Sequence, residues 1–479
     1  MCHKPFNSIP SIKSPLPGAG QYLFDEAAWA AAQWGQLELG DRRRTKRAVE
    51  LGLAMVRQPE GSLPEQLKSW GATKAAYRLL NESSLNLEKL SASHWQQSRQ
   101  ASGQVPVVLM LQDTTEVDLT SHKTMQGLGP IGNGRGRGFL LHSVLAVMPE
   151  GEQIVGMVHQ QTVLRQPRVA GKRPEQRSPE GLVWEKAVAQ VGSPPEACRW
   201  VHVGDSGSDN FGLLVACAKQ ARVEFLIRLC RNRLLGETAA DGTEQKLLTY
   251  GRQLPPQGPE IQVTVSPRQG QPQRQARLRL SWSQVTLPAP RRQADPHWAE
   301  HAPLTAWIVC ATEIAPPEDC EPLLWLLLSS CPVTCWSEAY QCTRWYSYRW
   351  LIEEFHKGLK TGCRLEERLL DHRHDLERLL GFLTPIAVRL LQLRQYARLA
   401  PDTFAHTLID PHLLQLLVAE LPAKKLSVAT MTISQFWYGL AQLGGHLGRK
   451  CDGPPGWLTL WRGYRYFLLL LRGTTYAFL

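Results

Sequence analysis

The chain has 479 residues and a formal net charge of +11. This length exceeds what one ordinary hydrophobic core needs, and it predicts about two to four domains. The excess of Lys and Arg indicates an anionic partner, of which a phosphate backbone is the commonest. The 11 cysteines include no Cys-x-x-Cys pair, which argues against a zinc site and favours reduced thiols. No apolar stretch reaches the roughly 18 residues that would span a bilayer, and no export signal opens the chain, so we expect a cytoplasmic protein.

The N-terminal part of the chain reads as a loose tail followed by a helical domain. Residues 1–22 are rich in Pro and Ser, and helical periodicity follows in residues 23–100. Two of these helices carry basic residues that could lie on a phosphate backbone. They could equally belong to a small bundle whose basic face is only solvated. The candidate DNA contacts are Arg43, Arg44, Arg47, Lys74 and Arg78.

Residues 101–395 have the pattern of an α/β domain. A buried strand at Val107–Leu111 precedes two strands, Phe139–Val147 and Val155–Val163, which a hairpin turn joins. A helix is expected at about residues 180–191, and a further strand follows it. The order is therefore three strands, a helix and a strand.

Two aspartates follow predicted strands. Asp113 comes after Val107–Leu111, and Asp205 comes after Trp200–Val203. Catalytic groups in open α/β sheets gather outside the carboxyl ends of the strands, so the two carboxylates could share a site. Either could instead be a turn or cap residue, and Asp209 is expected to cap the helix that follows.

Between residues 236 and 323 the pattern changes to alternating stretches such as Ile261–Val265, which indicate a β-rich insertion. Arg228 ends the strand before this insertion and is a candidate phosphate contact. Trp325 lies in the apolar run after it, where a buried aromatic side chain in a strand is the simplest account.

A polar stripe follows the insertion. Tyr346, Arg349, Glu353 and Lys360 are spaced so that, at about 100° per residue, they fall within roughly a 60° sector of one helix face. The apolar residues on the opposite side are Leu351, Ile352, Phe355 and Leu359. The stripe is either a solvated charged face or part of a site. In a site, Glu353 would join the two aspartates in holding a pair of Mg²⁺ ions, which prefer carboxylate oxygens.

Three motifs together resemble the cut-and-paste bacterial transposases of the insertion-sequence-four and transposon-five group. They are Leu-Gln-Asp-Thr-Thr around Asp113, Gly-Asp-Ser around Asp205, and the signature Tyr-x2-Arg-x3-Glu-x6-Lys from Tyr346 to Lys360. The resemblance covers nearly the whole chain, fading in the insertion and near the N-terminus. It implies a ribonuclease-H-like fold whose catalytic triad is Asp113, Asp205 and Glu353. These three residues would bind two Mg²⁺ ions, for which Mn²⁺ is expected to substitute.

The resemblance also implies roles for the other regions. Residues 23–100 would recognise the transposon ends, and the helical residues 396–479 would pair two subunits as a homodimer. An apolar C-terminal helix could equally pack on its own chain. Trp325 would stack on a base flipped out of the DNA end. The residues that would hold the phosphate next to the cleaved bond are Tyr346, Arg349 and Lys360.

Three functions are compatible with these features. The preferred one is a DNA transposase that performs end nicking, hairpin formation, hairpin resolution and strand transfer into target DNA. The alternatives are a catalytically silent inhibitor that occupies transposon ends, and a related metal-dependent DNA nuclease. In each case the partner is double-stranded DNA, no membrane is involved, and the protein would reside in the bacterial cytoplasm, with the nucleoid when bound to DNA.

Overall fold

The structure is a computed structural model. It describes residues 25–166, 179–238, 242–265, 274–291, 297–318, 320–396, 401–407, 409–421, 424–449 and 452–477. The chain forms two compact units. The helical unit contains Met1–His94, Gly358–Leu365 and Arg378–Leu479, and the sheet unit contains Trp95–Lys357 and Glu366–Glu377. The expected mixed α/β composition is confirmed.

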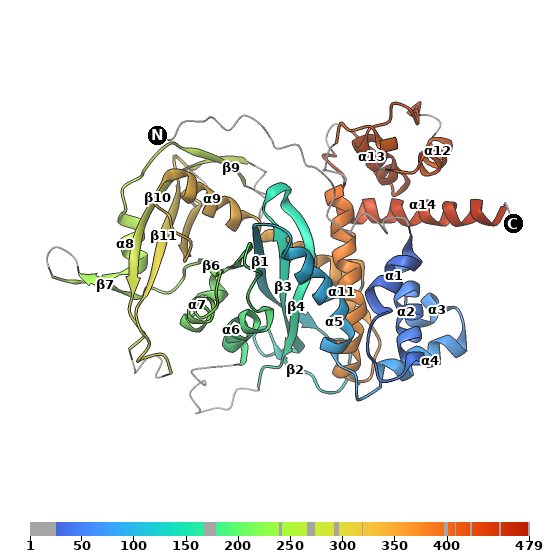
Figure 1. The fold of residues 1–479 in the computed structure, drawn as a ribbon, viewed down its shortest axis with the longest axis horizontal. Helices are drawn as coiled ribbons and strands as arrows, with labels where there is room; N and C mark the ends of the chain where they lie inside the picture. Colours follow the sequence, from blue (N-terminus) through green and yellow to red (C-terminus); the bar gives the residue numbers. More distant parts are fainter. Residues whose placement is uncertain are drawn as a thin grey trace. The chain divides into compact units, whose positions relative to one another are not determined.

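A 10-stranded mixed sheet forms the centre of the sheet unit (Figure 1). Its order is β2-β3-β1-β5-β6-β12-β11-β10-β9, and β4 also pairs with β3. The strands are β1 (Val107–Asp118), β2 (Gly129–Ile131), β3 (Gly136–Met148), β4 (Gln153–Val163), β5 (Arg199–Gly204), β6 (Val223–Arg228), β9 (Ile261–Val265), β10 (Arg274–Leu287), β11 (Leu304–Glu313) and β12 (Leu324–Ser329). β5 is parallel to both β1 and β6, whereas β1 and β3 are antiparallel.

The first strand is longer than its apolar run predicts. Pairing between β1 and β3 runs from Leu109 opposite Val147 to Asp118 opposite Gly138, so β1 continues well past the buried segment. The predicted hairpin is confirmed, since β3 and β4 are joined by a short 3-10 turn. The helix predicted before the fourth core strand is also confirmed as α6 (Pro179–Val191).

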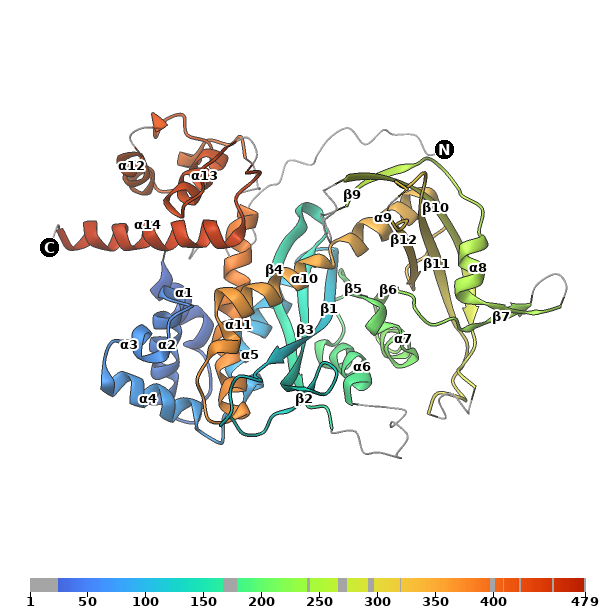
Figure 2. The ribbon, with the colours of Figure 1, turned by 180° about the vertical axis from the view of Figure 1, so that it is seen from behind.

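Both faces of the central strands are covered. Val108 and Met110 of β1 pack with Ala187 and Val191 of α6 in one apolar cluster. In addition, α10 (Trp350–Lys357) packs on β1 and β3 (Figure 2). A strand covered on two faces needs a continuous apolar run, which is what β1 carries in its first half.

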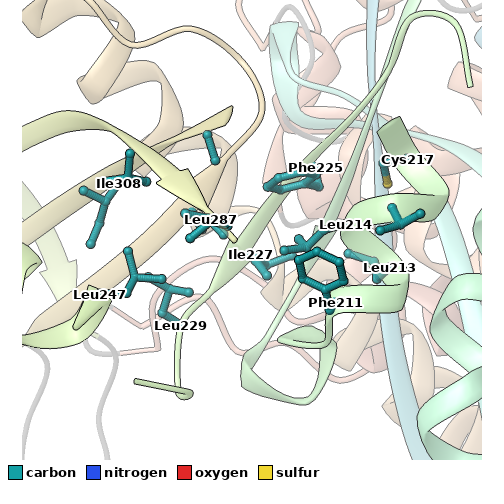
Figure 3. Packing of buried hydrophobic residues seen from close by; sticks show 14 of the residues in the cluster. Phe211, Leu213, Leu214, Cys217, Phe225, Ile227, Leu229, Leu247, Leu287 and Ile308 are labelled. Carbon is teal, nitrogen blue, oxygen red and sulfur yellow. The ribbon is translucent and has the colours of Figure 1, made fainter. Parts of the chain in front are cut away.

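The insertion is β-rich, as its alternating pattern predicts, and most of its strands extend the central sheet. β12, which follows the insertion, pairs antiparallel with β6, and the insertion strands β11, β10 and β9 follow in turn. One apolar cluster runs from Phe211 of α7 (Phe211–Ala218) and Phe225 of β6 to Leu287 and Ile308 of the insertion (Figure 3). The insertion therefore shares its hydrophobic core with β6, α6 and α7. A two-stranded sheet, β7 (Leu234–Thr238) with β8 (Glu244–Lys246), and helix α8 (Leu247–Gln253) complete it.

The described elements of the helical unit are helices. They are α1 (Glu26–Trp34), α2 (Arg42–Arg57), α3 (Leu63–Leu67), α4 (Trp70–Leu80), the first half of α5 (Leu87–Ser102), most of α11 (Arg373–Tyr396), then α12 (Pro411–Glu420), α13 (Ile433–Leu443) and α14 (Trp457–Ala477). Side-chain oxygens of Asp25, Asp41 and Ser69 accept backbone N–H groups at the starts of α1, α2 and α4. Such caps satisfy donors that the first helical turn leaves unpaired.

The core of this unit is built around large aromatic side chains. The Trp34 indole is buried and donates through Nε1 to the Gly381 carbonyl at 3.2 Å. The buried Arg389 guanidinium lies 4.8 Å from the Trp29 ring centroid and donates to the Tyr464 hydroxyl at 3.1 Å. No helix among the described residues is both long enough and apolar enough to cross a membrane.

Candidate active site and nucleic-acid interface

Asp113 and Asp205 stand next to each other in the register of the sheet. The parallel pairing of β1 with β5 ends at Gln112 opposite Gly204; Asp113 is the next residue of β1, and Asp205 is the first residue after β5. Asp205 leaves the sheet there, and its side chain accepts the Gly207 N–H at 2.8 Å. The sequence predicted that Asp113 follows the end of its strand. This prediction is wrong, because β1 continues past Asp113 along β3. Asp113 nevertheless lies where β5 stops.

Electrostatics couple Asp113 to the other candidate residues. Burial, followed by the nearby charge of Asp205, raises the pKa of Asp113 to about 7. The Thr114 backbone N–H and the Arg349 guanidinium oppose this increase in the pKa, and the charge of Glu353 contributes to it. The charges of Asp205, Glu353 and Arg349 therefore all affect the ionisation of Asp113. Three ionised carboxylates repel one another unless a cation balances their charge.

Glu353 projects from a helix that is fixed by its apolar face. The side chains that hold this face in the core are Leu351, Ile352 and Phe355. The Glu353 carboxylate is 55% exposed, and its Oε1 lies 2.5 Å from a guanidinium nitrogen of Arg349. Glu353 is thus paired with an internal cation in this structure.

The polar stripe does not lie on one helix. Tyr346 is near the end of α9 (Trp336–Ser347), Arg349 lies in a turn, Glu353 is on α10, and Lys360 is on a π-helical segment, Gly358–Gly362. The prediction of a single helical face is therefore wrong. Tyr346 is also buried instead of lining an open polar surface. Lys360 belongs to the helical unit, so the sheet unit alone brings together the first three residues.

An aromatic pair adjoins these residues. Trp325 on β12 is half-buried, and its ring lies 5.3 Å from that of Tyr346 in an edge-on arrangement. Burial raises the pKa of the Tyr346 phenol, while the charges of Arg349 and Arg228 lower it. Arg228 is exposed at the end of β6 and donates to the Leu324 carbonyl at 3.4 Å. Trp325 is therefore partly exposed, and its ring is in contact with the ring of Tyr346.

His356 is a neighbour of Asp113 to which the sequence assigned no role. Its Nδ1 lies 3.7 Å from Asp113 Oδ2, and its Nε2 lies 3.2 Å from the Ser143 hydroxyl. Gln160 donates to the same hydroxyl at 3.0 Å. The sequence could have indicated this role, because His356 follows Glu353 by three residues and the two side chains therefore lie on the same side of a helix.

Beneath Asp113 runs a buried chain of hydrogen bonds. The Gln112 amide nitrogen lies 2.6 Å from His202 Nδ1, and the Gln112 oxygen lies 3.1 Å from His142 Nε2. His142 Nδ1 lies 2.8 Å from the Thr114 hydroxyl. Burial lowers the pKa of both imidazoles, so both are neutral near pH 7. The chain fixes the residues on either side of Asp113.

Asp209 holds a basic loop. It is not the cap of α7 that the sequence predicted, because Asn210 takes that position and accepts the Leu213 N–H at 2.8 Å. Asp209 is buried instead, and its Oδ2 accepts the N–H groups of Cys230 and Arg231 at 2.8 and 2.7 Å. It also forms an ion pair with Arg233. The loop that follows Arg228 is thereby tied to the turn that follows Asp205.

The basic residues of the N-terminal helices differ in how they are used. Arg44 is bound to the Leu39 carbonyl, the Ser84 hydroxyl and the Glu82 carboxylate, so its guanidinium connects parts of the helical unit. Arg47 pairs with Glu50 at 2.7 Å. The remaining candidates are exposed, with no side-chain partner among the described residues; they are Arg43, Lys74 and Arg78.

Asp113, Asp205 and Glu353 supply oxygen ligands that a metal ion could use, but they are not arranged around a common metal position. Among the described residues, no group of three or more His, Cys, Asp or Glu side chains is placed to hold a metal ion. At this site the Glu353 carboxylate is paired with Arg349. The donor set still suits a hard divalent cation, since it consists of carboxylate oxygens, and burial together with the charges of Asp205 and Glu353 raises the pKa of Asp113.

Residues 26–85 match the family model described as transposase DNA-binding. The matched segment contains α1, α2, α3 and α4 of the helical unit. The match supports a transposase and supports DNA as a partner of the chain. It also favours the DNA-contact interpretation of the basic N-terminal helices over a merely solvated basic face.

Proposed function

We propose that the chain is a cut-and-paste DNA transposase whose catalytic triad is Asp113, Asp205 and Glu353. The observation that carries the proposal is the coupling of these three carboxylates beside Arg349, in a chain whose N-terminal region matches a transposase DNA-binding family. The strand order β4-β3-β1-β5-β6, antiparallel on one side of β1 and parallel on the other, supports a ribonuclease-H-like core. The motifs shared with the insertion-sequence-four and transposon-five group support the same reaction.

The three carboxylates would hold Mg²⁺ or Mn²⁺. When bound, a pair of such ions supplies activation of the attacking water or 3′-hydroxyl and stabilisation of the departing 3′-oxygen. For Glu353 to join the aspartates, its carboxylate must exchange Arg349 for a cation. Arg349 is then available to bind the phosphate next to the cleaved bond, which suits a planar guanidinium with two parallel donors.

The neighbouring side chains would orient the DNA. Tyr346 would donate its phenolic hydrogen to the same phosphate, and Arg228 and Lys360 would bind the flanking backbone. Trp325 would stack on a base turned out of the duplex, since its ring is held by Tyr346 while part of it stays exposed. These residues would fix the strand in place, while the three carboxylates would hold the ions that assist the phosphoryl transfer.

The assembly and the cellular setting belong to the same proposal. A homodimer, paired through residues 396–479, would let one protein complex hold both ends of the element. The sequence of events would be nicking, hairpin formation, hairpin resolution and strand transfer. The protein would act on DNA in the bacterial cytoplasm.

Cleavage of defined DNA ends tests the proposal. Purified protein is incubated with labelled duplexes that carry the terminal repeats of the element, in Mg²⁺ or in EDTA. Hairpin and flush-end products should form only in Mg²⁺ and should vanish in Glu353→Gln. The matched control is Glu354→Gln, which changes the adjacent carboxylate on the same helix and should keep the products.

The other outcomes separate the alternatives. Specific binding without cleavage in either Mg²⁺ or Mn²⁺ would identify an inhibitor that occupies transposon ends. Cleavage that ignores the terminal sequence and never joins a 3′-hydroxyl to target DNA would identify a general nuclease.

A further inference from the structure

An exposed tryptophan stands at the first position of α4. The Trp70 side chain is 77% exposed, whereas Thr73, Ala76 and Leu79 of the same helix are buried. Tryptophan is a large apolar residue that normally loses most of its accessible surface on folding. Isolated exposed apolar residues are ordinary, but this one is accompanied by charge on its own face of the helix.

Two cations share that face. Lys74 and Arg78 follow Trp70 at i+4 and i+8, so the three side chains lie within about 80° around the axis at about 100° per residue. Both are exposed and, within the part of the chain that the structure describes, neither has a carboxylate partner. The helix itself contains no Asp or Glu. On α2, by comparison, Arg44 and Arg47 are paired with glutamates, and of the candidate DNA contacts on that helix only Arg43 is exposed without a side-chain partner among the described residues.

The turn before α4 holds the start of this helix in place. α3 is followed by Lys68 in the left-handed conformation with φ 54°, and its N–H donates to the Pro64 carbonyl at 2.9 Å. Ser69 then caps α4 by accepting the Ala72 N–H at 3.4 Å. The two helices pack on each other and on α2. Helix α3, the tight turn and helix α4, packed on α2, resemble a helix-turn-helix arrangement. In that motif the second helix enters the major groove of DNA.

We propose that the face of α4 formed by Trp70, Lys74 and Arg78 is the surface that reads the terminal DNA sequence. The inference rests on the proposed function and deepens it, because it names the helix and the aromatic residue that distinguish the element's own ends. Trp70 contacts the base edges, where an apolar ring suits a thymine methyl group or an unstacked step. Lys74 and Arg78 bind phosphates and set the register of the helix on the duplex.

The position of Trp70 within the helix supports this division of roles. Residues at the N-terminal end of a recognition helix approach base edges most closely, and Trp70 is the first residue of α4. Arg78, in the last turn, lies farther along the helix, where backbone contacts are expected. The transposase DNA-binding match at residues 26–85 includes all three residues and supports DNA as the occupant of this face.

Equilibrium binding of the full chain tests the inference. Fluorescence anisotropy is measured in EDTA on a duplex with the terminal repeat and on a scrambled duplex of equal composition, at several salt concentrations. Trp70→Ala should weaken binding to the terminal repeat by about tenfold or more and leave the scrambled duplex nearly unaffected. Trp70→Phe should restore most of the preference. Lys74→Ala and Arg78→Ala should weaken both duplexes and lower the slope of log K against log salt by about one each.

The controls make the result decisive. Leu369→Ala removes another exposed apolar side chain, 82% exposed in the sheet unit, and should change neither duplex. Thermal unfolding of each variant shows that the fold is intact. A Trp70→Ala protein that still prefers the terminal repeat as the wild type does would overturn the inference. If Trp70→Ala kept wild-type DNA binding but no longer self-associated, the face would be a contact with a second copy of the chain. That result would also overturn the inference.

The two proposals fail separately. A wild-type protein with no preference for the terminal repeat would reject the proposed transposase function. A wild type that prefers it, together with an unaffected Trp70→Ala variant, would reject only the role of this face. Because EDTA is present throughout, loss of catalysis cannot imitate either result.

Discussion

A guanidinium nitrogen of Arg349 lies 2.5 Å from Oε1 of Glu353, so the carboxylate that would complete a metal site is held by an internal cation. Under the proposed function, a divalent ion would compete with the arginine for the same oxygen. We expect Arg349→Ala to lower the Mg²⁺ concentration needed for half-maximal end cleavage severalfold. The maximal cleavage rate should fall on the order of 100-fold, because a donor to the transferring phosphate is lost. Cleavage rates across a Mg²⁺ titration measure both effects.

The matched control for this variant is Arg344→Ala. Arg344 lies on the preceding helix and donates to the Tyr348 hydroxyl at 2.8 Å, away from Glu353. It should leave the Mg²⁺ dependence unchanged. If Arg349→Ala also kept the wild-type Mg²⁺ dependence, the idea of competition would be wrong. Stability should change by less than about 1 kcal/mol from loss of the pair itself, since Glu353 is more than half exposed.

His356 connects Asp113 with the Ser143 hydroxyl and is expected to act by positioning the carboxylate. His356→Ala should lower the cleavage rate constant by about tenfold, the scale of a misplaced catalytic group, without changing the Kd for terminal DNA. His356→Gln, which can still reach both neighbours, should recover part of the rate. A rate equal to that of the wild type in His356→Ala would remove this residue from the site.

The buried Asp209 stabilises the loop that carries Arg231 and Arg233. Asp209→Ala should lower the free energy of unfolding by about 3 kcal/mol, because it leaves a mostly buried guanidinium unpaired along with two backbone N–H groups. Asp209→Asn should cost less, since the amide oxygen can still accept one of those N–H groups. Hydrogen exchange of the Cys230 and Arg231 amides provides the local measurement. Protection that survives in Asp209→Ala would show that other contacts hold the loop.

Acid should destabilise the helical unit through His94. Burial lowers the pKa of this imidazole to about 4, below its usual value of 6.5, and its Nδ1 lies 2.9 Å from the Gln33 side-chain oxygen. Below pH 6.5 His94 binds a proton in the unfolded chain but stays neutral in the folded chain. The free energy of unfolding therefore decreases as the pH falls from about 6.5 to 4. The loss can reach about 3 kcal/mol. Thermal melts at pH 7.5 and 5 should therefore differ more for the wild type than for His94→Gln, and equal differences would contradict the assignment.

The sequence was informative where one local rule decides the structure. The alternation in Ile261–Val265 and the hairpin turn before β4 each produced the predicted element, because side-chain period and turn chemistry act over a few residues. The apolar run of β1 was also recognised. Its full length was not, since the second half of the strand depends on pairing with β3, which is set by tertiary structure.

The candidate site depended more strongly on such distant contacts. The spacing of Tyr346, Arg349 and Glu353 suits one helix, yet the chain turns between α9 and α10, and Tyr346 is buried against Trp325. Periodicity cannot reveal a two-residue break. In the same way, Asp209 precedes a helix and looks like its cap, but its partners lie more than 20 residues away in sequence, so no local rule identifies them.

A pair of glycines tests how closely the helical unit is packed. A Cβ added to Gly52 on α2 would overlap the Trp34 ring, whereas a Cβ on Gly71 of α4 would meet only the Ser69 hydroxyl at 3.9 Å. Gly52→Ala should therefore destabilise the unit by about 1 to 3 kcal/mol, the usual cost of overpacking. Gly71→Ala should be neutral or stabilise by up to about 1 kcal/mol, because alanine favours the helix. Thermal unfolding of both variants decides the matter. Equal effects would mean that the Trp34 indole can move aside, and that the aromatic core does not fix the position of α2.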